Sequence, residues 1–124
     1  MLQIYYFKMN FAEFLINDFK GDSKLKSIKF FRSNGAYGYI TWLTVISSYL
    51  NKTELTSEKL VIILEPYASR RTALDFLDKS FKNGFIEKKS SANDKRKTLL
   101  EPSKITLVEF NEWSLEFISN LRPL

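Results

Sequence analysis

The sequence predicts a mainly helical (α+β) fold with one small β-hairpin. Apolar residues recur every three or four positions in several segments, which is the spacing of a helix with one buried face. The chain has only four Gly and three Pro, which favours long helices over a turn-rich β-sandwich. One pair of short apolar segments around a polar, basic tip predicts the hairpin. We expect the 124 residues to form a single domain, residues 1–124.

Two helices are predicted in the first half of the chain. Residues 7–19 carry phenylalanines on one helical face, and a short basic segment, residues 24–32, follows them. The dipeptide Asn34-Gly35 then marks a turn before a second helix over residues 36–49. The predicted buried stripe of this second helix is Ile40, Leu43, Ile46 and Leu50, widened by Tyr39 and Trp42.

The aromatic residues of the second helix have two interpretations. An apolar stripe with helical spacing usually packs in a core or against a second copy of the chain. The alternative is a pocket for a small apolar effector, lined by Tyr39, Trp42 and Tyr49.

A helix-turn-helix is predicted next. Its first helix spans residues 58–64 and ends before Pro66, which disfavours helical geometry in the preceding residue. Its second helix spans residues 70–82, with Ser69 as the N-cap and Gly84 as the left-handed residue after its end. The predicted inward face of the second helix is Ala73, Phe76, Leu77 and Phe81.

A hairpin and a last helix complete the chain. Two strand-like segments, residues 85–89 and 95–100, flank a polar tip and form a wing at residues 85–101. Residues 105–121 regain the apolar periodicity of a helix. A helix-turn-helix followed directly by a basic hairpin is the order of a winged-helix DNA-binding domain.

The charge distribution favours a polyanionic partner. The formal net charge is +5, and the excess is concentrated in residues 70–104, which hold ten basic and five acidic side chains. A basic excess of this kind attracts nucleic acid electrostatically. The basic residues therefore lie in the predicted recognition helix and wing.

Several kinds of chemistry are excluded by composition. The chain has neither Cys nor His, which removes disulfides, thiol redox chemistry, Ser-His catalysis and Cys/His zinc sites. Glu109, Glu112 and Glu116 lie three and four residues apart, but this spacing is typical of an ordinary solvated helix face. We predict a protein that is not an enzyme and that needs no cofactor or metal.

No membrane segment is predicted. The apolar start of the chain is interrupted by Lys8, Asn10 and Glu13 before a secretory signal could form, and the longest apolar stretches are too short to cross a bilayer. We expect a cytoplasmic protein.

The basic side chains of the winged core are the predicted DNA contacts. Arg70 and Arg71 lie in the first turn of the recognition helix, where they reach guanine or phosphate. Asp75 and Asp78 repel phosphate unless they pair with neighbouring cations. The alternative is that these charges are only a solvated surface. The predicted DNA-binding residues are Ser69, Arg70, Arg71, Thr72, Lys79, Lys88, Lys89, Asp94, Lys95, Arg96 and Lys97.

Residues 57–103 resemble the DNA-binding core of the MarR-type (multiple antibiotic resistance) regulators. The resemblance rests on Ser69-Arg70-Arg71-Thr72, on Asn83-Gly84-Phe85-Ile86-Glu87-Lys88 and on the wing tip Asn93-Asp94-Lys95-Arg96. It implies that Arg96 inserts into the minor groove and that Asp94 holds it in place. The sequence departs from the family pattern at Ser80, where a leucine is usual, and in the longer turn over residues 65–68.

The terminal segments are predicted to form a dimer interface. A short chain with 19 aromatic residues has more apolar surface than one small core hides, so we assign dimerisation to residues 4–33 and 104–124 around the core, residues 36–103. The alternative is that these helices pack only on their own domain. The predicted interface residues are Phe7, Phe11, Phe14, Phe110, Trp113, Phe117 and Leu121.

These features together predict a homodimeric, sequence-specific DNA-binding transcription regulator. We expect a repressor bound to a pseudo-palindromic operator, because two recognition helices related by a two-fold axis match successive major grooves. The alternative is a winged-helix module of a mobile-element replication or partition protein, which would bind iterated sites at an origin instead.

Overall fold

The computed structural model describes residues 12–20, 24–119 and 121. Within these residues, positions 12–19 are helical. The elements that follow are α2 (Lys26–Arg32), α3 (Gly35–Leu50), α4 (Ser57–Leu64), α5 (Arg70–Lys82), β1 (Ile86–Ser90), β2 (Thr98–Pro102) and α6 (Lys104–Ser119). The described chain is therefore mainly helical with one antiparallel hairpin, as the sequence predicts.

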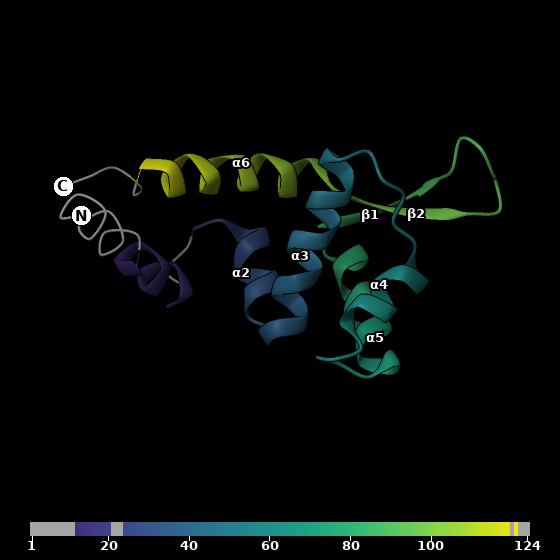
Figure 1. Cartoon of the computed structure of the whole chain (residues 1–124), viewed down its shortest axis with the longest axis horizontal. Coiled ribbons are helices and arrows are strands. Elements are labelled where there is room, and N and C mark those ends of the chain that lie inside the picture. The colour runs from purple at the N-terminus through teal and green to yellow at the C-terminus, as the bar shows by residue number, and fades with distance from the viewer. Residues whose placement is uncertain (1–11, 21–23, 120, 122–124) are drawn as a thin grey trace, which may run out of the picture.

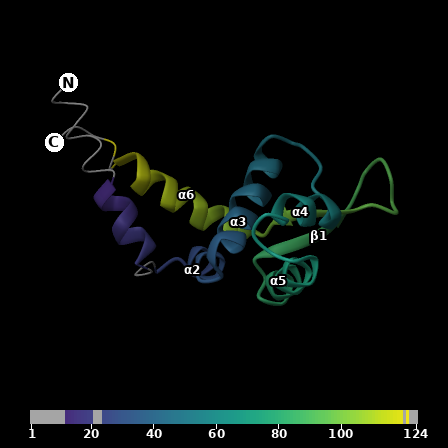
Figure 2. The same ribbon diagram turned by 60° about the horizontal axis from the view of Figure 1, so that its bottom comes forward.

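The elements form a helical body with the wing at one end. Helices α3, α4 and α5 pack with the hairpin, and α6 returns from β2 along α2 (Figure 1). The view in Figure 2 shows the same arrangement, with residues 12–19 beside the far end of α6 and the hairpin tip at the opposite end of the molecule. The hairpin tip and the far end of α6 therefore lie at opposite ends of the described structure.

Helix α3 lies at the centre of the core, but not on the predicted face. Trp42, Val45 and Ile46 are buried, whereas Leu43 and Leu50 are 37% and 60% exposed. The prediction was right for Trp42 and Ile46 and wrong for Leu43 and Leu50, because α3 contains no charged residue to mark its solvent side. Packing instead selects the face that carries the small residues Gly38 and Thr41, which are both buried.

Gly38 allows α2 and α3 to approach each other closely. A Cβ atom at this position would lie 2.1 Å from the backbone oxygen of Phe31 and 2.9 Å from the Cβ of Asn34. Because the Phe31 oxygen is backbone, it cannot move aside as a side chain would. The contact between the two helices therefore requires glycine at position 38.

We expect Gly38→Ala to destabilise the fold even though alanine is the better helix former. Helix propensity alone would stabilise the variant by about 1 kcal/mol. Overpacking of a tight contact costs about 1–3 kcal/mol and sometimes more, and here the clash is with backbone. Urea unfolding of the two proteins measures the difference in the free energy of unfolding. Ala36→Gly, at an exposed position of the same helix, is the control and should cost about 1 kcal/mol or less, the difference in helix propensity alone; a Gly38→Ala protein as stable as the parent would contradict the close approach.

The N-terminus of α2 is capped by a residue from the far end of the chain. The carboxylate of Glu109 accepts hydrogen bonds from the backbone N–H groups of Lys26 (3.2 Å) and Ser27 (2.7 Å), and from the Ser27 hydroxyl (2.6 Å). A carboxylate at this place satisfies free helix N–H groups and complements the helix dipole. Glu109 therefore joins α6 to α2 and is not the ordinary solvated residue that its spacing suggested.

Helix α5 has the predicted bounds and a slightly different inward face. Ala73, Phe76 and Leu77 are buried as expected, but the fourth buried residue is Ser80 and not Phe81, which is half-buried. The Ser80 hydroxyl donates to the backbone oxygen of Phe76 at 2.9 Å, so the buried polar group is satisfied. After the helix, Gly84 has a φ of +76°, which is the predicted left-handed conformation.

The hairpin is joined to the loop before α4. Strands β1 and β2 pair in antiparallel register from Ile86↔Pro102 to Ser90↔Thr98, so the second strand begins and ends later than predicted. The backbone N–H of Leu100 donates to the oxygen of Leu55 at 2.8 Å. The base of the wing is thus attached to the segment that follows α3.

The aromatic residues of the terminal helices pack against each other within one chain. Phe14 and Trp113 are each 8% exposed, with ring centroids 6.2 Å apart, and Phe117 lies 5.8 Å from Phe14. Trp113 also contacts the core residue Trp42 at 5.4 Å. Phe110 is half-buried beside these rings. Leu121 is also half-buried. Phe7 and Phe11 lie outside the described residues.

Candidate nucleic-acid interface

The start of α5 is organised by a Ser–Thr cap. The Ser69 hydroxyl accepts a hydrogen bond from the backbone N–H of Thr72 at 3.1 Å and lies 3.0 Å from the Thr72 hydroxyl. These two side chains therefore hold the first turn of the predicted recognition helix in place. The same turn presents Arg70 and Arg71, which are both exposed.

The two arginines differ in how they are held. Arg70 makes two hydrogen bonds to the carboxylate of Glu58 on α4, at 2.9 and 2.6 Å. Hydrogen bonding to Arg70 lowers the pKa of Glu58, and the same pairing raises the pKa of Arg70. The Arg71 side chain is 93% exposed, and its Nε is 4.0 Å from Asp75. Arg70 thus joins α5 to α4, whereas Arg71 extends into solvent.

The two aspartates of α5 each lie near a cation. Asp75 faces Arg71 in the loose contact just described, and Asp78 lies 2.9 Å from the Lys82 ammonium. The hydrogen bond to Asp78 raises the pKa of Lys82. Because both carboxylates have a cationic neighbour, their repulsion of a phosphate backbone is reduced. Lys79, the other predicted contact on this helix, is exposed.

The wing tip pairs Asp94 with Arg96. The Asp94 carboxylate accepts a hydrogen bond from the backbone N–H of Arg96 at 3.0 Å, and the Arg96 Nε lies 3.5 Å from the same oxygen. The Arg96 side chain is nevertheless 94% exposed. Asp94 therefore orients the arginine without covering its guanidinium. Lys95, between them, is also exposed.

The two predicted lysines of β1 contact different elements. The Lys88 ammonium lies 4.5 Å from the centre of the Phe81 ring, a cation–π contact between β1 and α5. Lys89 lies 3.7 Å from Glu101 on the opposite strand. Lys88 therefore joins the hairpin to α5, whereas Lys89, on the opposite face of β1, joins the two strands.

Glu54 fastens the wing, and sequence reasoning missed it. Its carboxylate accepts hydrogen bonds from the Ser91 hydroxyl at 2.9 Å and from the Lys97 ammonium at 3.3 Å. These bonds, first from Ser91 and then from Lys97, lower the pKa of Glu54. The partners lie 37 and 43 residues away along the chain, so no local pattern marks the contact. We call these three side chains the wing latch.

The wing latch is expected to open in acid. Because the folded-state pKa of Glu54 is below its ordinary value of 4.5, the latch stabilises the hairpin above that value and is lost as pH falls through the lowered pKa. Amide NMR shifts of Ser91 and Lys97 should therefore hold steady from neutral pH and change only in acid. In Glu54→Gln they should be displaced already at neutral pH and lack this titration. Glu87→Gln, on the exposed side of β1, is the control; a titration that persists in Glu54→Gln would contradict the latch.

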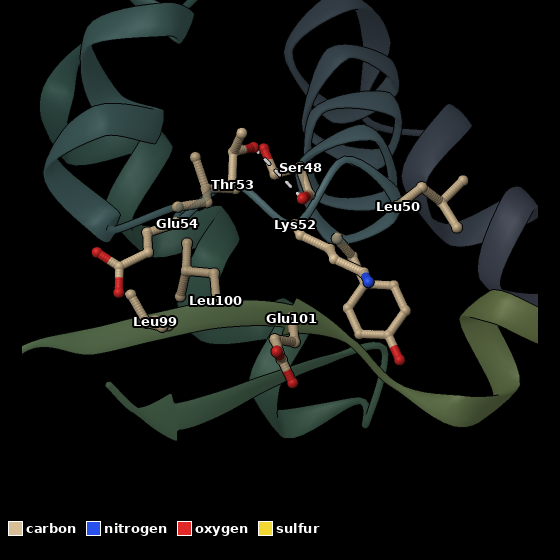
Figure 3. A pocket seen from close by; sticks show the side chains of 10 residues that line it. Ser48, Leu50, Lys52, Thr53, Glu54, Leu99, Leu100 and Glu101 are labelled. Atoms are coloured by element: carbon tan, nitrogen blue, oxygen red, sulfur yellow. Dashed lines mark hydrogen bonds between the residues drawn. The ribbon is translucent and has the colours of Figure 1, made fainter. Parts of the chain in front are cut away.

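The predicted effector pocket does not form around Trp42. The Trp42 side chain is 1% exposed and its ring lies 5.7 Å from that of Tyr39, within the core. Tyr49 lies near the end of α3, where it lines a cavity of about 470 Å³ whose lining includes neither of the other two residues. Figure 3 shows this cavity between the loop after α3 and β2. Trp42 is thus a core residue, as the first of the two interpretations of this helix held.

Neither a membrane span nor a metal centre is found in the part of the chain that the structure describes. None of its helices combines the length and apolarity needed to cross a bilayer. Among the same residues, no three acidic side chains gather as ligands for an ion.

Comparison with solved structures shows the fold. The chain is similar to the heme sensor protein PefR, solved in complex with heme and carbon monoxide, with a TM-score of 0.54, 17% identity, and 89% of this chain and 73% of PefR covered. It is also similar to the transcriptional regulator SlyA, with a TM-score of 0.49 and 16% identity over 69% of this chain. The match spans about half of SlyA, 55% of its length. No protein-family model matches the sequence. No curated protein matches it. The likeness to PefR confirms the predicted fold, a mainly helical winged helix-turn-helix.

Proposed function

We propose that this protein is a sequence-specific DNA-binding transcription regulator that acts as a homodimer and represses from a pseudo-palindromic operator. The observation that carries the proposal is that the predicted recognition helix and the wing each present one exposed arginine. Arg71 extends from the first turn of α5, and Arg96 extends from the wing tip while Asp94 orients it. The proposal is supported by their positions, because winged-helix domains use a recognition helix and a wing to contact DNA.

The two arginines have different roles in this proposal. A recognition helix enters the major groove with its first residues toward the bases, where an arginine forms a bidentate pair with guanine. The wing reaches the adjacent minor groove, whose narrow A·T-rich stretches concentrate negative potential that attracts an arginine. Arg71 therefore reads bases, and Arg96 reads groove shape.

The homodimer is supported by apolar residues that the chain itself leaves exposed. Phe14 and Trp113 are used inside one chain, so a second copy must contact other residues of the same helices. Large apolar side chains with between 38% and 77% exposure on these helices are Leu15, Ile16, Phe19, Ile105, Val108, Leu115 and Ile118. A two-fold interface brings the same surface of two copies together, and so buries these side chains in both. Two recognition helices then face half-sites about 34–36 Å apart or a multiple of that distance.

Selection of DNA from a random library by the purified chain tests the proposal. We expect an enriched inverted repeat of about twenty base pairs, with affinity that falls steeply as salt rises because phosphate contacts release counterions. Iterated direct repeats would favour a replication or partition module instead. A chain that enriches no sequence, or whose affinity does not depend on salt, would remove the proposed function.

The wing is tested separately. We expect Arg96→Ala to weaken binding to every sequence, and most strongly where A·T-rich segments flank the half-sites. Asp94→Ala should have a smaller effect of the same kind, because it frees the arginine without removing its charge. Fluorescence anisotropy with duplexes that differ only in their flanks measures both, and Lys29→Ala on the exposed side of α2 is the control. Unchanged affinity of Arg96→Ala on all flanks would show that the wing is not a DNA element.

The heme that PefR binds does not fit the donor groups of this chain. Most protein hemes are held by His or Cys, and the sequence contains neither. We therefore propose a regulator that does not use heme.

A further inference from the structure

We propose that Glu54 is a specificity-determining residue: through the wing latch it keeps Lys97 from phosphate and orients the wing tip, so that Arg96 sets the preference for flanking sequence. The effect on DNA rests on the proposed function, whereas the latch is a property of the free chain. Glu54 lies on the loop before α4, outside the recognition helix and the wing, and Figure 3 shows it beside Leu99 of β2. It is therefore a positioning residue that acts through the wing.

Glu54 attaches the wing tip, residues 91–97, to the helical body. One carboxylate oxygen, Oε2, accepts from the Ser91 hydroxyl at 2.9 Å, and the other, Oε1, accepts from the Lys97 ammonium at 3.3 Å. Ser91 is 3% exposed, so its hydroxyl has little access to water as an alternative partner. Among the described residues, no other side chain outside the hairpin makes a hydrogen bond or an ion pair with the tip. Loss of the carboxylate therefore removes the polar attachment of the tip.

A short series of hydrogen bonds leads from the latch to Arg96. The backbone N–H of Ser91 donates to the Lys97 oxygen at 3.1 Å, and the backbone N–H of Lys97 donates to the Asp94 oxygen at 3.0 Å. The Asp94 carboxylate in turn accepts from the backbone N–H of Arg96 at 3.0 Å. Lys97, which Glu54 holds by its ammonium, is thus bonded directly to the residue that orients the arginine. A change in the latch therefore reaches Arg96 through its own support.

The latch also occupies a cation that is a predicted DNA contact. The Lys97 side chain is 48% exposed while it is paired with Glu54. A lysine on phosphate adds affinity on every sequence and carries no sequence information. Because the ion pair must break before Lys97 contacts phosphate, the latch lowers this sequence-independent part of the affinity. Arg96 is 94% exposed and lies 3.5 Å from Asp94, so the tip presents the arginine more freely than the lysine.

Opposite changes in affinity and in specificity distinguish this role from a purely structural one. Removal of a carboxylate beside a DNA-binding surface raises the affinity for DNA, because a charge that repels phosphate is lost. Removal of a residue that only supports the fold lowers the affinity on every sequence. We expect Glu54→Gln to keep or raise the affinity on G·C-rich flanks and to lose preference for A·T-rich flanks. A glutamine keeps at most one of the two bonds, because Ser91 and Lys97 donate to different oxygens.

Fluorescence anisotropy with the full chain tests the proposal, on a duplex that the chain selects, with A·T-rich or G·C-rich flanks and over a series of salt concentrations. Glu54→Gln should reduce the ratio of the two affinities by about threefold or more. It should also steepen the salt dependence by about one phosphate contact, because Lys97 is released. Ser91→Ala removes one bond without a change of charge, and should reduce the ratio without steepening the salt dependence. Glu87→Gln, on the exposed side of β1, is the charge-matched control and should leave the ratio unchanged.

The same substitution in an Arg96→Ala chain tests the route of the effect. There Glu54→Gln should no longer change the ratio, because the residue that reads the flank is absent. The proposal is overturned by an unchanged ratio in either latch variant, by an equal loss of affinity on both flanks, or by a ratio that still falls without Arg96.

A measurement on the free chain separates the latch from the proposed function. A parent chain that binds no DNA contradicts the proposed function, and the hold of Glu54 on the tip is then tested by NMR. Heteronuclear NOEs of the Asp94 and Arg96 amides should fall in Glu54→Gln, because the tip moves more freely on the ps–ns timescale. Unchanged values would refute the hold of Glu54 on the tip.

Discussion

Arg71→Ala is expected to weaken DNA binding by about 1–3 kcal/mol at particular base pairs and to relax discrimination there. The Arg71 side chain is 93% exposed and lies in the first turn of α5, the end of the helix that enters the major groove in the proposed complex. Its only described ion-pair contact, to Asp75, is 4.0 Å long, so it is readily given up for a guanine edge. Truncation to alanine therefore removes a base contact and not a structural one.

Arg70→Ala is the matched comparison, because the neighbouring arginine is already bonded to Glu58 through two hydrogen bonds. We expect this variant to lose affinity evenly over all sequences, since it removes a positive charge and a contact between α4 and α5. Binding of both variants to a library with randomised half-sites measures the two specificities. Equal loss of discrimination in the two variants would show that the bond to Glu58 does not divide their roles.

Trp42→Ala is expected to lower the free energy of unfolding by about 3–5 kcal/mol, the usual cost of removing a large buried aromatic side chain. Trp42 is 1% exposed and its ring contacts those of Tyr39, Phe110 and Trp113 at 5.7, 5.7 and 5.4 Å. It joins α3 to α6, so its loss also loosens the attachment of the terminal helices to the winged core. Urea unfolding measures the change.

Trp42→Phe separates ring packing from the indole N–H. The indole nitrogen of Trp42 is buried and has no hydrogen-bond partner among the described residues, so its removal leaves no acceptor unsatisfied. We expect this variant to retain most of the stability that Trp42→Ala loses. A small effect of Trp42→Ala, below about 1 kcal/mol, would contradict the core role and favour the pocket interpretation.

The elements with local signals were predictable from the sequence. Ser69 caps α5, the helix has the predicted bounds, and Gly84 adopts the left-handed conformation after it. The hairpin and its Asp94–Arg96 tip also form in the predicted region, although the second strand begins and ends later than predicted. In each case the deciding interactions join residues within four positions of one another, or adjacent strands across a short turn. Such interactions are encoded by residue type and spacing alone.

The tertiary structure decided which face of each helix is buried and which distant side chains meet. Helix α3 carries no charge, so its buried face depended on the close approach of α2 at Gly38 and not on periodicity. Glu109 on α6 caps α2, and Glu54 holds the wing, across separations of 37 to 83 residues. The division of roles between Arg70 and Arg71 likewise depends on Glu58 in another helix. Contacts of this kind follow from the packing of whole elements, because a spacing pattern records only neighbours along the chain.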